Sequence, residues 1–405
     1  MKRLHRRWFC LTVAVAMATA GGCSSTGGKS AGKDKNAATA QWRMARASVL
    51  MTLARDQFNT GQFDQARVTI ADAIRLLPDN PEVRTLSGRI AFEQGNLELA
   101  EAEFRAAQTA DPNFAPADYY LGIVMQRWQR YPRALELYAS ASRKNPMEVA
   151  YLTAQAEMLV MLDRSPDALL LLQQALPRFE NSADLRAAIG HVLLRQRRFA
   201  EAADMLRQAL LLAPQDDVVR ETLARAQFQA GRFDDAAETL ARLLRNERYR
   251  DRADLHTLLG ECHLEAGRPH DARAAFETAS QLQPGNLTYI LNLAKAALEV
   301  DDLRRAELAV RRALAISPSD GQANLMLGYV RLQQQRYPEA LAAFRRSAQA
   351  DNRDPTAVTM SGLALERMGR KEEAMREYAR ALELRPNDEL ARQRLNQLAA
   401  AAAGD

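Results

Sequence analysis

The sequence has 405 residues, of which 47% are hydrophobic and 6% aromatic, so the chain is long enough to bury a large core. Ala, Leu, Arg and Glu are abundant, while Gly and Pro occur mainly in short turns, which indicates an all-helical protein. The formal net charge is +5, but four basic residues stand within the first seven, in a segment that we expect to be removed. The rest of the chain is close to neutral, so bulk charge gives no reason to expect nucleic-acid binding.

Residues 1–22 have the layout of a secretory signal peptide, with a basic start, an apolar run from Trp8 to Ala20, and small residues before Cys23. The apolar run is shorter than the roughly 20 residues that a membrane-spanning helix needs. We therefore expect export from the cytoplasm. Cleavage before Cys23 and ordinary cleavage near Ala20 are both compatible with this layout.

The end of that segment, Ala20-Gly21-Gly22-Cys23, resembles a bacterial lipobox, although Ala20 stands where leucine is usual. The resemblance implies that Cys23 is lipidated and anchors the protein to a membrane. Ser24 follows instead of aspartate, which implies the outer membrane, with the chain facing the periplasm. The run Arg6–Phe9 is also similar to a twin-arginine export signal, which stays an alternative route.

Residues 23–40 are rich in Gly, Ser, Lys and Thr, with almost no large apolar side chain. Such a composition cannot bury enough apolar surface to fold, so we expect a flexible tether. The tether would hold the folded part just off the membrane.

From about residue 47 onward the chain repeats itself with a period of 34 residues. One column contains only alanine: Ala66, Ala100, Ala134, Ala168, Ala202, Ala236, Ala272, Ala306, Ala340 and Ala374. A second column is mostly proline, and a third contains only Gly and Ala, for example Gly88, Gly190 and Gly362. Such a period predicts stacked supersecondary units, each of which buries its apolar face against its neighbours.

Each unit reads as two amphipathic helices joined by a tight turn. In the last unit the helices are expected near Thr356–Met368 and Lys371–Leu384, with Gly369 in the left-handed turn between them. Ala374 is expected to face the first helix at its closest approach, where a larger side chain would push the helices apart.

These columns resemble the tetratricopeptide repeat over about residues 47–388. The resemblance implies an all-α, right-handed superhelical α-solenoid of about ten 34-residue helix pairs. Units 1–6 would occupy 41–250, units 7–10 would occupy 251–388, and 389–405 would form a capping helix and tail. The aromatic residue that the family carries at position 4 is absent, which affects packing detail only.

Two places interrupt the repeat. Pro177 falls near the end of a second helix, which we expect to be short. Unit 6 lacks its final proline and is followed by two extra residues, within the highly charged segment Arg245–Arg252. We expect this segment to be a hinge between the two groups of units, or else a longer turn without functional meaning.

Residue types that could perform chemistry are sparse, so we expect a non-enzymatic protein without a cofactor. The densest group is His256, Glu261, Cys262, His263 and His270, which could bind a metal. Their repeat positions instead favour histidines in the core or in turns, and we expect no metal. With one cysteine lost and another acylated, only Cys262 would remain, so no internal disulfide is expected.

By the same resemblance, the first helices line a concave groove that binds an extended protein or peptide segment. The expected groove side chains are Tyr119, Tyr120, Arg127, Glu157, His191, Arg195, Arg225, Gln229, Glu261, Asn292, Lys295 and Tyr329. Aromatic anchors beside charged groups suit such a partner. The alternative is a solvated inner face with contacts elsewhere. The lysine and asparagine with which some relatives bind a C-terminal carboxylate are absent.

The function that fits best is a lipid-anchored periplasmic scaffold in an envelope assembly or secretion system. Layout alone does not choose among type IV pilus pilotin-like, outer-membrane and polysaccharide-export assemblies. The alternative is an accessory module of a peptidoglycan or glycosyltransferase enzyme complex. The first hypothesis is a binding function and the alternative ties the repeats to catalysis. In both, the membrane is contacted through the lipid and no nucleic acid is involved.

Overall fold

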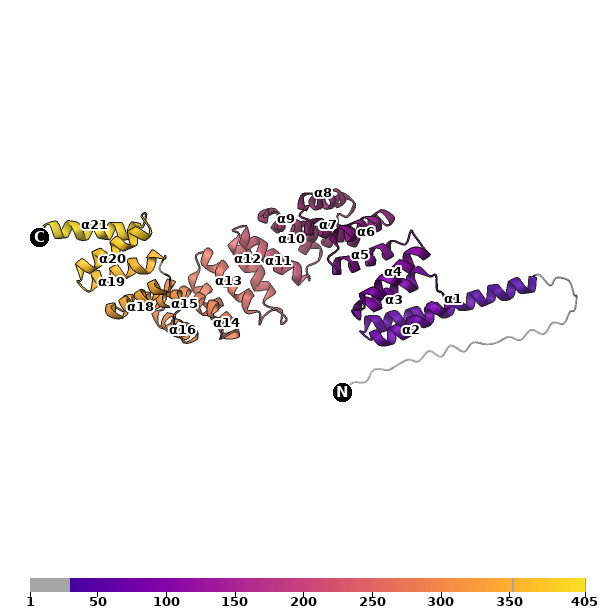
Figure 1. Cartoon of the computed structure of the whole chain (residues 1–405), viewed down its shortest axis with the longest axis horizontal. Coiled ribbons are helices and arrows are strands. Elements are labelled where there is room, and N and C mark those ends of the chain that lie inside the picture. The colour runs from indigo at the N-terminus through magenta and orange to yellow at the C-terminus, as the bar shows by residue number, and fades with distance from the viewer. Residues whose placement is uncertain (1–29, 352, 405) are drawn as a thin grey trace, which may run out of the picture. The chain divides into compact units, whose positions relative to one another are not determined.

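The computed structural model describes residues 30–351 and 353–404, and the side chains of 37–351 and 353–400. Throughout these residues the secondary structure is helical, and within each part of the chain neighbouring helices pack as pairs, such as α1 with α2 and α19 with α20 (Figure 1). No described helix is both long enough and apolar enough to cross a bilayer. The expected signal peptide and Cys23 lie outside the described residues.

Contacts divide the chain into two units, the first ending at Trp128 and the second beginning at Gln129. The helices of the first unit are α1 (Ser30–Asn59), α2 (Phe63–Leu76), α3 (Pro81–Glu93), α4 (Leu97–Ala110) and α5 (Ala115–Arg127).

The second unit continues the same pattern to the C-terminus. Its helices are α6 (Tyr131–Lys144), α7 (Val149–Met161), α8 (Ser165–Ala175), the 3₁₀ turn η1 (Leu176–Arg178), α9 (Ala183–Arg195), α10 (Phe199–Leu212), α11 (Asp217–Gln229), α12 (Phe233–Leu243), α13 (Ala253–Glu265), α14 (Pro269–Leu282), α15 (Leu287–Glu299), α16 (Leu303–Ile316), α17 (Gly321–Gln333), α18 (Tyr337–Ala350), α19 (Pro355–Arg367), α20 (Lys371–Leu384) and α21 (Glu389–Gly404).

The alanine column is the centre of every repeat, because all ten alanines are completely buried. The small residues of the first helices pack against the large residues of the second. A Cβ atom added at Gly88 would lie 2.5 Å from the ring of Phe104, and one at Gly362 would lie 2.7 Å from that of Tyr378. Close approach of the paired helices therefore requires these columns, and the expected all-α solenoid of helix pairs is confirmed.

The short second helix expected in the fourth repeat is confirmed: α8 ends at Ala175, and a 3₁₀ turn contains Pro177. The segment expected as a capping helix and tail forms the single helix α21, which continues to Gly404. It packs against α20, with Ala391 and Leu398 buried.

The expected tether differs from the structure over residues 30–40, which form the first part of α1. Four alanines and two lysines, both strong helix formers, stand in this segment, so the helix that packs in the first repeat extends backward through it. The remaining tether residues, 23–29, lie outside the described part.

The segment Arg245–Arg252, for which the sequence leaves a hinge and a longer turn open, forms a packed loop. Tyr249 is 6% exposed and belongs to a core cluster with Leu240, Leu243 and Leu255. The Asn246 amide also donates to Asp217 at 2.6 Å. Core contacts therefore continue across the charged loop. The division of the chain by contacts lies elsewhere, between α5 and α6.

Candidate functional site

In the N-terminal part of the chain, which ends at Trp128, the first helices of the first three repeats are α1, α3 and α5. They place an arginine between two aromatic rings. Cζ of Arg89 on α3 lies 4.7 Å from the ring centroid of Phe58 on α1 and 5.1 Å from that of Tyr120 on α5. We call Phe58, Arg89 and Tyr120 the arginine clamp. Cation–π contacts of this kind stabilise by roughly 0.5–2 kcal/mol, depending on how far they exclude water.

The repeat explains why these three side chains meet. Phe58, Arg89 and Tyr120 occupy positions 12, 9 and 6 of consecutive repeats, a diagonal across neighbouring helices. Residues three positions apart share one helix face, so each step keeps the side chain on the exposed side of its helix.

The aromatic rings behind the clamp hold it in place. Tyr120 stacks on Phe104 with centroids 5.6 Å apart and planes at 17°, while Tyr119 meets Tyr120 edge to face at 5.3 Å. Phe104 is 1% exposed, so the stack is anchored in the core of the second repeat.

A cavity of about 120 Å³ opens beside the clamp. Its lining is Phe58, Arg89, Phe92, Glu93, Phe104, Tyr120 and Ile123. The cavity is mostly aromatic, with one cation and one carboxylate. Such a site can hold an apolar side chain and orient the polar group beside it.

In the second unit, the expected groove residue Arg225 lies in an ion-pair network. Its guanidinium is 3.0 Å from Glu221 on its own helix and 3.4 Å from Asp254 on α13. Arg252 contacts the same two carboxylates, at 3.1 and 2.6 Å. Hydrogen bonds to Asp254 and Glu221 raise the pKa of Arg252. The hydrogen bond from Arg252 lowers the pKa of Asp254. The network fixes α11 to α13, so Arg225 has a structural role.

Tyr329 is half-buried instead of standing free in a groove. Its ring packs edge to face on Phe344, with centroids 5.6 Å apart. Burial raises the pKa of the Tyr329 phenol, and the charge of Asp354 adds to this shift. Its hydroxyl therefore remains protonated at neutral pH.

The other expected groove residues lie on successive first helices and do not gather into one cluster. Those with exposed side chains are Arg127, Glu157, His191, Arg195, Gln229 and Lys295, whereas Asn292 and Glu261 are half-buried. Burial raises the pKa of the Glu261 carboxyl, and the charge of Lys295 partly offsets the increase.

The members of the histidine group of the seventh repeat have different surroundings: His270 is exposed, His263 is half-buried and Cys262 is buried. Nε2 of His256 lies 2.8 Å from the carbonyl oxygen of Arg250, so this side chain binds the loop before its helix. Cys262 is fully buried, and burial raises the pKa of its thiol to about 12. Among the described side chains, no three metal-ligating residues lie close enough together to hold an ion.

Sequence reasoning identified Tyr119 and Tyr120 but missed Phe58, Arg89 and Phe104 as their partners. The available signal was the diagonal spacing of an arginine between two aromatics. Phe104 occupies a position that is apolar or aromatic in every repeat, which by itself indicates packing and not a site.

Family models match nearly the whole folded part in adjoining pieces. Models described as tetratricopeptide repeat match residues 51–113, 127–183 and 185–218. A model described as the C-terminal domain of cilia and flagella-associated protein 70 matches residues 216–404.

Two curated bacterial proteins are similar at 24% identity. One is a TPR repeat-containing protein of Treponema pallidum (strain Nichols), aligned over 62% of this chain and 33% of its own length. The other is cellulose synthase operon protein C of Pseudomonas fluorescens (strain SBW25), aligned over 74% of this chain and 25% of its own length. The chain thus spans a third or less of both relatives.

Among solved structures, a tetratricopeptide repeat protein from Parabacteroides merdae is 18% identical. The alignment covers 63% of this chain and 99% of that one, with a TM-score of 0.43.

Ten sequence periods, their packing as successive helix pairs, and the adjoining matches to repeat models together identify the chain as a tetratricopeptide-repeat protein.

Proposed function

We propose that this protein is a non-enzymatic, lipid-anchored scaffold that binds protein partners in an envelope assembly or secretion system. The observation that carries the proposal is the arginine clamp with its adjoining aromatic cavity on the first helices. Tetratricopeptide arrays in general bind protein partners. An extended segment with an apolar side chain beside a polar group matches the lining of this cavity.

The anchor is the second part of the proposal. The lipobox-like residues before Cys23 support acylation at that cysteine, and Ser24 supports the periplasmic face of the outer membrane. Metabolic labelling with an alkynyl palmitate analogue tests the anchor. We expect the label on the native chain and none on Cys23→Ala; a label that persists on the variant would disprove acylation at this residue.

The clamp is tested by crosslinking in intact cells, followed by purification and quantification of the crosslinked proteins. We expect Arg89→Ala and Tyr120→Ser to reduce recovery of a specific partner by about tenfold, the loss typical of a hot-spot side chain. Arg75→Ala is the matched control, because this arginine is 78% exposed and pairs only with Asp72 one turn earlier. If Arg89→Ala and Tyr120→Ser keep their thermal stability and recover as much of the partner as Arg75→Ala does, the partner binds elsewhere.

A second candidate is an accessory module of a peptidoglycan or glycosyltransferase complex. It is favoured by the similarity to cellulose synthase operon protein C over 74% of this chain. The same crosslinking experiment separates the two ideas. A polysaccharide synthase or peptidoglycan enzyme as the Arg89-dependent partner supports the accessory module, whereas secretion or outer-membrane assembly components support the scaffold.

A further inference from the structure

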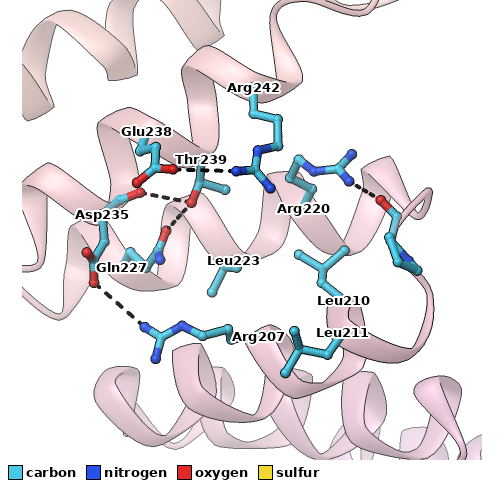
Figure 2. Close-up of a pocket in the computed structure, with 11 residues that line it drawn as sticks. Arg207, Leu210, Leu211, Arg220, Leu223, Gln227, Asp235, Glu238, Thr239 and Arg242 are labelled. Atoms are coloured by element: carbon cyan, nitrogen blue, oxygen red, sulfur yellow. Dashed lines mark hydrogen bonds and ion pairs between the residues drawn. The ribbon is translucent and has the colours of Figure 1, made fainter.

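A larger cavity lies at the second helices of the fifth and sixth repeats, away from the clamp in the sequence. Its volume is about 460 Å³, within the range of ligand-binding pockets. The lining side chains come from α10, α11, α12 and the turn between α10 and α11: Arg207, Leu210, Leu211, Pro214, Arg220, Leu223, Gln227, Asp235, Glu238, Thr239 and Arg242 (Figure 2).

The floor of this cavity is apolar, and one of its residues departs from the repeat. Leu211 is 76% exposed and lies beside Leu210, with Leu223 at the centre of the cavity (Figure 2). In the other nine repeats, the position of Leu211 holds Arg75, Thr109, Arg143, Pro177, Arg245, Gln281, Ala315, Gln349 or Glu383. Only the fifth repeat places a large aliphatic side chain there, next to two further leucines, where it extends an apolar surface.

Two arginines on the rim have only loose partners. Arg207 reaches Asp204 at 3.4 Å and Asp235 at 3.6 Å, because Arg232 already holds Asp204 at 2.7 Å. Arg242 reaches Glu238 at 3.4 Å, with both side chains more than half exposed. Exposed pairs of this kind contribute little to stability, so an incoming carboxylate can compete for either guanidinium.

The third arginine is part of the wall. Arg220 is 11% exposed, pairs with Asp217 and donates to the carbonyl oxygen of Pro214. On the other side, the Thr239 hydroxyl donates to Gln227 at 2.8 Å, which fixes the polar end of the cavity. Arg220, Gln227 and Thr239 are therefore held in place, whereas Arg207 and Arg242 can adjust to an occupant.

We propose that this cavity binds a peptide segment of a partner protein in which a large apolar residue is flanked on both sides by acidic residues. The apolar side chain would cover Leu211 and Leu223. Arg207 and Arg242 lie on opposite sides of Leu223, so each faces one flanking acid (Figure 2). Asp235 and Glu238 on the rim disfavour a nucleic acid, whose closely spaced phosphates would meet them.

Selection of randomised dodecapeptides, displayed on phage, against the full chain tests the proposal. We expect enriched peptides to carry Leu, Phe or Trp with Asp or Glu on both sides. Binding of the synthetic, fluorescein-labelled peptides is then measured by fluorescence anisotropy. Leu211→Ser should weaken binding by about tenfold, as should the double variant Arg207→Glu, Arg242→Glu. A peptide with lysines in place of its acids should recover binding to that double variant.

Matched controls come from equivalent exposed side chains outside the cavity. Leu308→Ser replaces a leucine that is 63% exposed on α16, and Arg75→Glu reverses a 78% exposed arginine on α2. Neither should change the affinity. Binding lost in Arg89→Ala but kept in Leu211→Ser would place the peptides at the clamp and overturn this proposal while supporting the clamp. Absence of enrichment, or enrichment without flanking acids, would also overturn it.

Discussion

At the residue scale, the turn inside each repeat depends on one backbone conformation. Position 15 has a positive φ in all ten repeats, between 57° and 78°. Glycine occupies it in five repeats, whereas the others hold Gln129, Asp163, Arg197, Asp301 and Gln335. Side chains with a Cβ are strained in this left-handed region by roughly 1–2 kcal/mol.

Arg197→Gly should therefore stabilise the protein by up to about 1 kcal/mol. The relief of left-handed strain is partly offset by the greater chain entropy of glycine when unfolded. Urea unfolding of the full chain measures the change in free energy. Gly231→Ala is the reverse test, since its φ is 74°, and it should destabilise. A loss of stability in Arg197→Gly would show that its side chain contributes more than the strain costs.

The alanine column makes a second prediction at this scale. Ala202 is fully buried between α9 and α10, so Ala202→Leu should lower the free energy of unfolding by about 1–3 kcal/mol through overpacking. Ala200→Leu, on the exposed side of the same helix, is the control and should change stability by less than about 0.5 kcal/mol. If calorimetry shows that Ala202→Leu and Ala200→Leu lower stability equally, the alanine column is not the point of closest helix approach.

At the element scale, ion pairs connect neighbouring repeats, as between Glu307 and Arg331. Glu307 on α16 accepts hydrogen bonds from Arg331 and Gln334 at 3.0 and 2.8 Å. Arg331 is only 7% exposed in its side chain, and Glu307 is 19% exposed. The Arg331 hydrogen bond, followed by that of Gln334, lowers the pKa of Glu307 to about 2. The carboxylate thus holds the ninth repeat to the eighth.

The pH dependence follows from this lowered pKa. The folded state favours the charged carboxylate, so its contribution is present above the unfolded pKa near 4.5 and is lost as pH falls toward 2. Glu307→Gln should cost roughly 2–3 kcal/mol at pH 7 and much less near pH 2.5. Denaturant unfolding at both pH values checks this, with the exposed Glu136→Gln as control. If Glu307→Gln costs the same free energy of unfolding at both pH values, the charge of the carboxylate is not the origin of the stabilisation.

The charged loop between the sixth and seventh repeats gives the last prediction. Because Tyr249 packs among Leu240, Leu243 and Leu255, Tyr249→Ala should lower the free energy of unfolding by about 3 kcal/mol. It should also expose residues 245–252 to limited proteolysis. Glu247→Ala, at an exposed position of the same loop, serves as the control. Unchanged stability in Tyr249→Ala would contradict the packed loop and favour the hinge, the other alternative that the sequence leaves open.

At the scale of the whole molecule, stability is distributed along an array of neighbour contacts. The core clusters of the second unit each join adjacent repeats, such as the one from Leu152 to Ala226 and the one from Ala272 to Met326. In such an array, a substitution acts mainly on its own repeat and the next. The clamp and the leucine-lined cavity lie in different repeats, so variants at one site should not alter the other.

Much of this organisation follows from the sequence by itself. The period of 34 residues, the helix pairs, the turn at Gly369 and the short helix before Pro177 all depend on local propensity and on spacing along one chain. Those features repeat at every period, so each unit supports the assignment of the next. The residues expected to line a groove could be listed by counting, because the repeat fixes which side of a helix each position occupies, but their role stays a prediction.

Only the tertiary structure decided how side chains from different repeats meet. Arg89 lies between rings supplied by two other repeats, Arg225 is bound in a network, and Leu211 belongs to a cavity built from three helices. It also showed that Tyr249 packs into the core at the charged loop, where the sequence left a hinge and a longer turn open. The physical reason is that such contacts depend on distances between helices, which periodicity along one chain does not specify.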